Sequence, residues 1–148
     1  MKNHSPNPHQ ISGRTGLLIN IVVIVHLMFF LLEAVLWMQP AVYSPLIVLL
    51  DNPVSSPYPL QALVLKNLFI NQGFYNLFLV GAGLAGQWLV YKGRSSAGLA
   101  LILFMCFAAT GAGIVLAAST KAYLLAAFQA LPAIITIVRI YPVFKAYN

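Results

Sequence analysis

One stretch of the chain reads GLLINIVVIVHLMFFLLEAVLWM, from residue 16 to residue 38. A helix needs about 20 apolar residues to cross the roughly 30 Å hydrocarbon layer of a membrane, so this stretch is long enough. It carries one acid, Glu33, and the chain has only one other, Asp51. A charge at such a position costs roughly 2.5–3.5 kcal/mol on insertion scales and usually faces a bundle interior or a cavity. We therefore predict a membrane helix, with Glu33 as the first functional candidate.

The composition of the whole chain also favours a membrane protein. Of its 148 residues, 61% are hydrophobic and only 7% are charged. A soluble domain carries roughly 25% charged residues, which it needs to coat a surface that faces water. The eight Lys and Arg residues lie mostly near the ends of apolar runs, a pattern typical of membrane topology. The net charge of +6 is therefore no sign of nucleic-acid binding, and we expect none.

Three further apolar stretches are long enough to span a bilayer. The four predicted spans cover residues 16–38, 69–90, 97–118 and 122–140. Their continuous apolar runs, without alternation, predict helices and not a barrel. Short turns at 91–96 and 119–121 make consecutive helices antiparallel neighbours. We predict one all-α integral membrane domain, a four-helix up-down bundle between a disordered tail at 1–15 and a second tail at 141–148.

The first connector differs from the other two. It covers residues 39–68, and its five prolines predict a loop: Pro40, Pro45, Pro53, Pro57 and Pro59. The segment SPLIVLL at 44–50 is apolar but too short to span the bilayer. We predict that this segment lies at the membrane interface or enters the membrane and returns on the same side.

The distribution of positive charge predicts the orientation. With four spans, both tails and the 91–96 turn share one side, which carries six positive residues: Lys2, Arg14, Lys92, Arg94, Arg139 and Lys145. The opposite side carries Lys66 and Lys121. Because positive residues mark the cytoplasmic side, we predict both termini in the cytoplasm and the 39–68 loop outside. The expected location is the cytoplasmic (inner) membrane.

Small residues recur at helical spacing in three of the spans. They are Gly81, Ala82, Gly83, Ala85 and Gly86, then Ala109, Gly113 and Ala117, then Ala122, Ala126 and Ala130. Small residues let membrane helices approach closely, so we interpret them as packing devices within the bundle. A homo-oligomer interface is the alternative use. The single cysteine, Cys106, excludes an intrachain disulfide and fits a role as small core filler.

Polar residues in all four spans, including Thr110 in the third, fall in one half of the bilayer. His26 and Glu33 are seven residues apart, so they lie within roughly 20° of each other and about 10 Å apart along one helix face. The predicted topology places Glu33 and polar residues of the next spans in the outer half of the bilayer. We predict an outward-facing polar pocket beneath the proline-rich loop. Its candidate ligand- or proton-binding residues are Glu33, His26, Trp37, Asn71, Gln72, Tyr75, Asn76 and Gln129.

Structural interpretations of the same residues stay open. Buried amides such as Asn71 and Gln72 often cross-link helices, by about 0.6 kcal/mol on average. Trp37 and Tyr75 also fit interfacial belt aromatics, and His26 fits a satisfied core imidazole. One His, one Glu and amides make a weak donor set for a transition metal, so we predict no metal site. Phosphate loops, nucleophile triads and paired carboxylates do not appear, so we predict no cofactor and assign no catalytic residue.

Two motifs resemble a known family. HLMFFLLEAVLW at 26–37 and NQGFYNLFL at 71–79 are similar to the membrane proteins catalogued as domain of unknown function 1304. The similarity continues through Gly113-Ile114, the STK turn at 119–121, and Gln129 with Pro132. The resemblance implies four transmembrane helices and supplies no reaction. The residues that match its motif positions are His26, Glu33, Asn71, Gln72, Gly73, Tyr75 and Asn76.

One departure from the family pattern limits the mechanism. Family members often carry a glutamate just before the histidine, and Val25 stands there in this chain. A mechanism that needs two acids in the first span therefore does not fit this protein.

Three functions fit these observations. The first is binding of a small molecule or ion in the pocket, with Glu33 as a protonatable centre for proton-coupled transport. The second is a membrane enzyme on a lipid-like substrate, with Glu33 or His26 as general acid or base. The third is a non-catalytic assembly subunit that uses its small-residue faces. The sequence alone does not identify the ligand.

Overall fold

The computed structural model describes residues 11–51 and 54–147, and every regular element within them is helical. The elements are α1 (Gly13–Phe30), the π-helical turn η1 (Leu31–Val35), α2 (Pro40–Leu49), α3 (Tyr58–Tyr91), α4 (Ser95–Ser119) and α5 (Tyr123–Ala146). Within these ranges four helices are long and apolar enough to cross a membrane: α1 with η1, α3, α4 and α5. The predicted all-α class is confirmed, and the chain is a multi-pass membrane protein.

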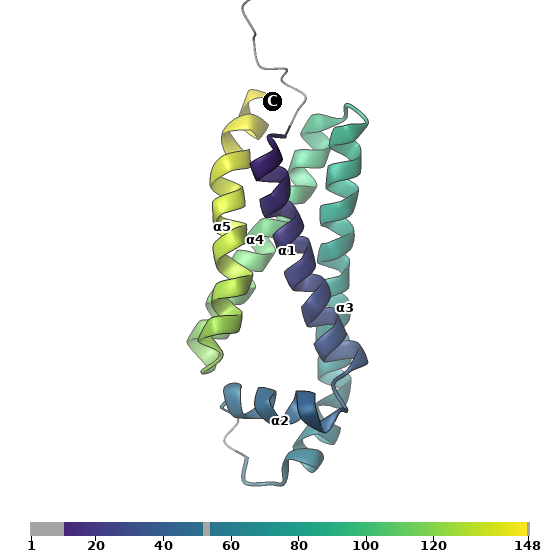
Figure 1. The fold of residues 1–148 in the computed structure, drawn as a ribbon, viewed down its shortest axis with the longest axis vertical. Coiled ribbons are helices and arrows are strands. Elements are labelled where there is room, and N and C mark those ends of the chain that lie inside the picture. The colour runs from purple at the N-terminus through teal and green to yellow at the C-terminus, as the bar shows by residue number, and fades with distance from the viewer. Residues whose placement is uncertain (1–10, 52–53, 148) are drawn as a thin grey trace, which may run out of the picture.

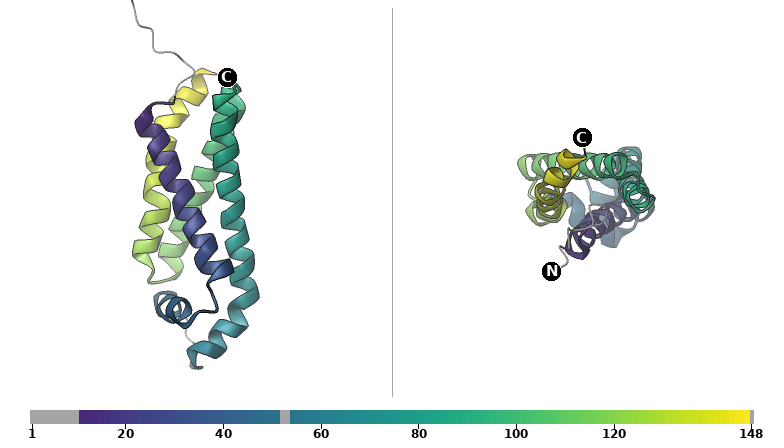
Figure 2. Two further views of the ribbon diagram at one scale, coloured as in Figure 1. Left: turned by 45° about the vertical axis from the view of Figure 1, so that its right-hand side comes forward. Right: turned by 90° about the horizontal axis from the view of Figure 1, so that it is seen from above.

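The four long helices run side by side and alternate in direction (Figures 1 and 2). Both ends of the described chain lie at the same end of the bundle as the turn between α3 and α4, and we call this the terminal end. α2 lies across the opposite end, which we call the α2 end (Figure 1). The side of the membrane that each end faces stays a prediction.

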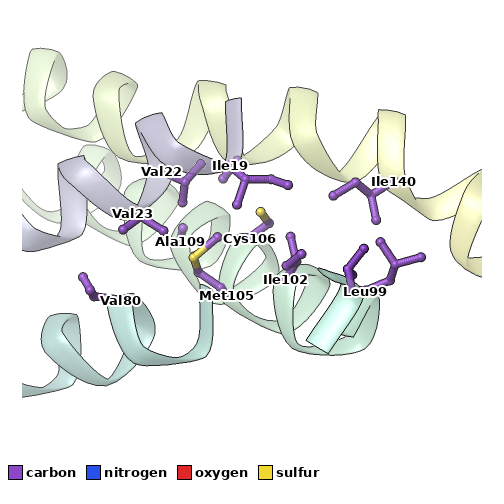
Figure 3. Close-up of a cluster of buried hydrophobic side chains, with 12 residues drawn as sticks. Ile19, Val22, Val23, Val80, Leu99, Ile102, Met105, Cys106, Ala109 and Ile140 are labelled. Carbon is purple, nitrogen blue, oxygen red and sulfur yellow. The ribbon is translucent and has the colours of Figure 1, made fainter. Parts of the chain in front are cut away.

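The main core fills the bundle from its middle toward the terminal end (Figure 3). Its buried side chains come from all four long helices: Ile19, Val22, Val23, Val80, Val90, Leu99, Ile102, Met105, Cys106, Ala109, Ala133 and Ile140. Close helix contacts occur at small residues, as predicted. A Cβ on Gly83 would lie 2.5 Å from Met105 Sδ, and one on Gly113 would lie 2.8 Å from the Ala126 oxygen. Gly81 differs, because nothing lies within 4 Å of the corresponding position.

The connector between α1 and α3 contains more helix than the sequence analysis predicted. α2 occupies Pro40–Leu49, and α3 begins at Tyr58, which is well before the predicted residue 69. Pro40 and Pro59 permit this because a helix does not use the N–H groups of its first turn, whereas Pro45 lies inside α2. Pro40 stands at the start of α2, while Pro57 caps α3. The SPLIVLL segment therefore belongs to a helix that lies across the bundle end.

The start of the first span and the end of the last span also differ from prediction. α1 begins at Gly13, where the Ser12 hydroxyl accepts a hydrogen bond from the Thr15 amide at 3.3 Å. Residues 1–10 of the predicted tail lie outside the described residues. α5 continues beyond residue 140, through Pro142, to Ala146. Membrane helices tolerate proline because neighbouring groups compensate for the lost backbone bond.

A second core joins α2 to the beginning of α3. It contains Trp37, Tyr43, Ile47 and Ala62, with Phe69 packed against it. The Trp37 ring stacks on Phe69 with centroids 3.6 Å apart, and its Nε1 donates to the Ala62 oxygen at 2.9 Å. The 34 residues of α3 extend about 51 Å at 1.5 Å per residue, so this helix contributes to both cores.

Candidate functional site

A cavity of about 360 Å³ lies between the two cores. The order of residues along the first helix shows this placement. Ile19 and Val23 belong to the main core, Phe29 and Glu33 line the cavity, and Trp37 belongs to the second core. Side chains from all four long helices and from α2 surround the space. The cavity is therefore a property of the assembled bundle and not of one helix.

The lining is mostly apolar with a small polar group. The polar lining residues are Glu33, Gln72, Asn76, Ser119 and Gln129. The apolar ones are Phe29, Leu32, Leu46, Leu49, Leu50, Phe69, Ala112, Val115, Leu116, Ala122 and Leu125. Among the described lining residues, Glu33 is the only one whose side chain carries a charge.

Glu33 stands in the middle of the π-helical turn η1. The Leu36 amide donates to the Leu31 oxygen at 2.8 Å, five residues back instead of four. Such turns are rare and often occur at functional sites. The next residue, Ala34, lies directly against Gly73 of α3, where an added Cβ would be 2.7 Å from Ala34 Cβ and 2.8 Å from its backbone nitrogen. The glycine therefore permits the close approach of η1 to α3.

Asn76 holds one oxygen of the Glu33 carboxyl group. Its Nδ2 donates to Glu33 Oε2 at 2.8 Å and to the Gln72 backbone oxygen at 3.2 Å. Asn76 is 4% exposed, so this contact lies inside the bundle. Across residues 11–51 and 54–147, the structure gives the carboxyl group no other hydrogen bond and no ion pair. Within these ranges the other oxygen, Oε1, has no hydrogen-bond partner.

The structure brings four of the eight candidate residues together at the cavity. Gln72 and Asn76 of α3 and Gln129 of α5 line it with Glu33, and Gln129 is 6% exposed. The four come from three separate helices.

The other four candidates lie elsewhere. Trp37 is buried in the second core and reaches the cavity only through Phe69, which lines it. His26 is fully buried, and because a carbonyl only accepts, its Nδ1 donates to the Val22 oxygen at 2.8 Å. Its Nε2 has no hydrogen-bond partner within the described part of the chain. Asn71 and Tyr75 are exposed, and Tyr75 shows 62% of its surface.

The sequence predicted that the proline-rich loop covers the pocket, but not which of its residues line the cavity. Leu46, Leu49 and Leu50 line it from α2 and the residue that follows, and Ser119 lines it from the end of α4. In the described ranges no group of three or more His, Cys, Asp or Glu residues is placed to hold a metal ion.

Two contacts fasten α2 to the turn between α4 and α5. The Lys121 amide donates to the Leu49 oxygen at 2.9 Å, and Lys121 Nζ forms an ion pair with Asp51 Oδ1 at 2.9 Å. The hydrogen bond that Lys121 Nζ donates to Asp51, together with the negative charge of Asp51, raises the pKa of Lys121. We call this pair of contacts the α2 tie. A signal for it existed in the sequence, because Asp51 and Lys121 have opposite charges and the predicted topology places both on one side.

The profile of a family described as "Protein of unknown function (DUF1304)" matches residues 20–141. The chain belongs to this family. The resemblance that the motifs predicted is therefore confirmed. No curated protein matches the chain, and no solved structure matches it.

The match to DUF1304 includes the whole cavity, since the lining residues run from Phe29 to Gln129. In this DUF1304 protein one acid, three amides and one hydroxyl therefore face a common space with apolar walls. Such a space offers hydrogen-bond acceptors on Glu33, Gln72 and Gln129, and Glu33 can take up or release a proton.

Proposed function

We propose that this protein binds a small molecule or ion in the cavity and that Glu33 is the group that meets it. The observation that carries the proposal is the convergence of Glu33, Gln72, Asn76 and Gln129 on one space between two packed cores. Small-molecule sites are typically concave and mostly apolar, with a few polar groups that orient the ligand. An ionisable residue within a membrane segment is by default a candidate functional group.

The finer proposal is proton-coupled transport. Glu33 binds either a proton or a ligand, so the two compete for the same carboxyl group. With both termini in the cytoplasm of a cell bounded by an inner membrane, the α2 end faces outward. The cavity then exchanges its ligand on the outer side, and α2 covers the exit.

Native mass spectrometry of the purified protein in lipid nanodiscs tests the proposal. We expect the wild type to carry a small mass that Glu33→Gln lacks, although both have the same helix content by circular dichroism. The wild type is expected to release this mass as the pH falls. The proton then occupies the carboxyl group of Glu33, so the ligand can no longer bind there.

Two neighbouring residues provide the matched control for this measurement. Gln72 lines the cavity, and Asn71 beside it does not. Gln72→Ala is expected to weaken retention of the bound mass, while Asn71→Ala retains it. Equal retention in the wild type and Glu33→Gln at every pH would contradict the proposal.

An enzyme acting on a lipid-like substrate is the second candidate. The observation that favours it is that apolar walls from α2, α4 and α5 surround a single acid, as an acyl chain would require. Turnover distinguishes the two functions. A co-purified lipid that is chemically altered by the wild type and unaltered by Glu33→Gln would support the enzyme.

A further inference from the structure

We infer that the ligand of the cavity is a protonated primary amine that carries a short hydrocarbon tail. This inference rests on the proposed function, because it names the chemical class of the molecule that meets Glu33. Three features of the cavity carry it: the charge of the lining, the hydrogen-bonding groups around Glu33, and the volume and apolarity of the remaining space.

The charge of the lining selects a cation. Glu33 is the only charged side chain among the described lining residues, and the nearby Lys121 already pairs with Asp51. An anionic ligand would meet no cationic partner in the lining, nor would the anionic half of a zwitterion, and an unpaired charge against apolar walls is unfavourable. A single positive charge pairs with the ionised Glu33 and leaves the cavity neutral.

The hydrogen-bonding groups favour a primary amine over other cations. A carboxylate offers about four acceptor sites, and Asn76 donates to only one oxygen of Glu33. The lining amides of Gln72 and Gln129 each add a carbonyl oxygen. An alkylammonium group carries three N–H donors, so it can bond the free carboxylate oxygen and amide oxygens together. A quaternary ammonium group has no donor to offer.

The rest of the space fits a hydrocarbon tail. Leu46, Leu49 and Leu50 form one apolar wall, and the other walls come from the long helices. Since a water molecule takes up about 30 Å³ of the liquid, 360 Å³ corresponds to roughly a dozen non-hydrogen atoms. An amine with a tail of roughly six to ten carbons fills this volume.

Trp37 provides a built-in reporter for binding. The chain has two tryptophans, and the other, Trp88, is 58% exposed near the end of α3. In a Trp88→Phe background Trp37 is the only tryptophan left. It stacks on Phe69, which lines the cavity, so a ligand that contacts Phe69 changes the emission of Trp37.

The experiment titrates this single-tryptophan protein in phosphatidylcholine nanodiscs with octylamine, octanol, octanoate and octyltrimethylammonium. Empty nanodiscs correct for partitioning into lipid. We expect a saturable response to octylamine with an affinity at least tenfold higher than for the other three probes. In Glu33→Gln the preference for octylamine over octanol is expected to disappear, whereas Asn71→Ala keeps it.

A second variant keeps the test valid if Glu33→Gln fails to fold. Ala112 is one of the apolar lining residues, so Ala112→Leu fills part of the cavity and leaves the acid in place in the sequence. The preferred amine is expected to shift from octylamine to a shorter one such as butylamine. An unchanged chain-length preference would overturn the assignment of the tail to this cavity.

The outcomes separate this inference from the proposed function. Tighter binding of octanol, octanoate or octyltrimethylammonium overturns the amine class and leaves ligand binding at Glu33 in place. The absence of a saturable response to all four probes also overturns the amine class. The proposed function itself fails only if the native mass spectra of wild type and Glu33→Gln carry the same bound mass.

Discussion

The hydrogen bond from Asn76 Nδ2 to Glu33 Oε2 joins two helices at the only acid of the cavity. Hydrogen bonds to charged groups contribute roughly 1.5–3 kcal/mol in soluble proteins, and interhelical ones in membranes average about 0.6 kcal/mol. The bond therefore positions the carboxyl group more than it stabilises the bundle. Its energy is nevertheless large enough to measure.

A double-mutant cycle tests this contact. We expect Asn76→Ala to lower the free energy of unfolding by about 1–2 kcal/mol, because it leaves Glu33 without its donor. The same change in a Glu33→Gln background is expected to cost less. Reversible unfolding in mixed detergent micelles provides the measurement, with Asn71→Ala as the exposed control. Strictly additive effects would contradict a contact whose strength depends on the charge of Glu33.

Two glycines of α3 form a matched pair for a second test. A Cβ on Gly73 would overlap Ala34 beside Glu33, whereas Gly81 has open space. We expect Gly73→Ala to destabilise the protein by about 1–3 kcal/mol, because η1 must move away from α3. Gly81→Ala is expected to be neutral or slightly stabilising, since alanine has the higher helix propensity. Similar unfolding free energies for both variants would contradict the close contact.

The sequence predicted the depth of polar residues better than the direction in which they point. Depth follows from hydropathy and helix length, which is why Glu33 was expected near the outer end of its span and Gln129 closer to the midplane. Direction depends on how each helix is rotated in the bundle. Successive residues differ by about 100°, so Gln72 lines the cavity while its neighbour Asn71 does not, although both side chains are exposed. For Trp37, η1 interrupts the regular periodicity before the chain leaves the helix.

At the scale of elements, α2 is the part of the fold that local sequence patterns did not predict. Its ten residues include Pro45, so its intrinsic helix propensity is low. Tertiary contacts compensate, because Tyr43 and Ile47 are buried in the second core. Isolated helices of this length are marginal in water, and packing supplies most of their stability. The α2 tie then fixes the C-terminal end of α2 beside the cavity.

Loss of the ion pair in the α2 tie is expected to loosen α2 without unfolding the bundle. Both side chains are exposed, and exposed ion pairs contribute little to global stability. We expect Asp51→Asn to speed amide hydrogen exchange in α2, while the main core keeps its protection. The bond from the Lys121 amide to Leu49 limits the effect. Lys66→Gln provides the control, and uniform acceleration across all helices would contradict this local role.

The same ion pair has a defined pH dependence. Asp51 raises the pKa of Lys121 above its ordinary value of 10.5. Because this pKa is raised, the stability that the ion pair gives to α2 is fully present below pH 10.5. It is lost as the pH rises through the pKa of Lys121 in the folded protein. Above the pKa of Lys121 in the folded protein, we expect the amide hydrogen exchange of α2 in the wild type to approach that of Asp51→Asn. Both rates are corrected for the intrinsic rate of exchange. High salt is expected to reduce the difference between the two proteins, because the pair faces solvent.

At the scale of the whole molecule, two cores on either side of one cavity explain how an acid is accommodated in an apolar bundle. The main core holds the four long helices together, and the second core holds α2 on the extended end of α3. Apolar length predicted the four spans, because it requires no knowledge of neighbouring helices. The cavity could not be predicted in this way, since its lining comes from five helices that meet only after folding.

The orientation of the bundle yields a test of the whole topology. Arg14, Lys92, Arg94 and Lys145 lie on segments at the terminal end, while Lys121 lies in the turn at the α2 end. Positive residues concentrate on the cytoplasmic side, so the terminal end is expected inside. Cys106 is fully buried, so the wild type is expected to resist a membrane-impermeant maleimide and to serve as the blank.

Single added cysteines at exposed positions then report the two ends. Ser55 lies between α2 and α3, and Lys92 follows α3 at the terminal end. We expect Ser55→Cys to react with the maleimide in intact cells, because the α2 end faces outward. Lys92→Cys is expected to react only after the membrane is opened. The reverse pattern would place the cavity on the cytoplasmic side, and the proposed ligand exchange would then occur from within the cell.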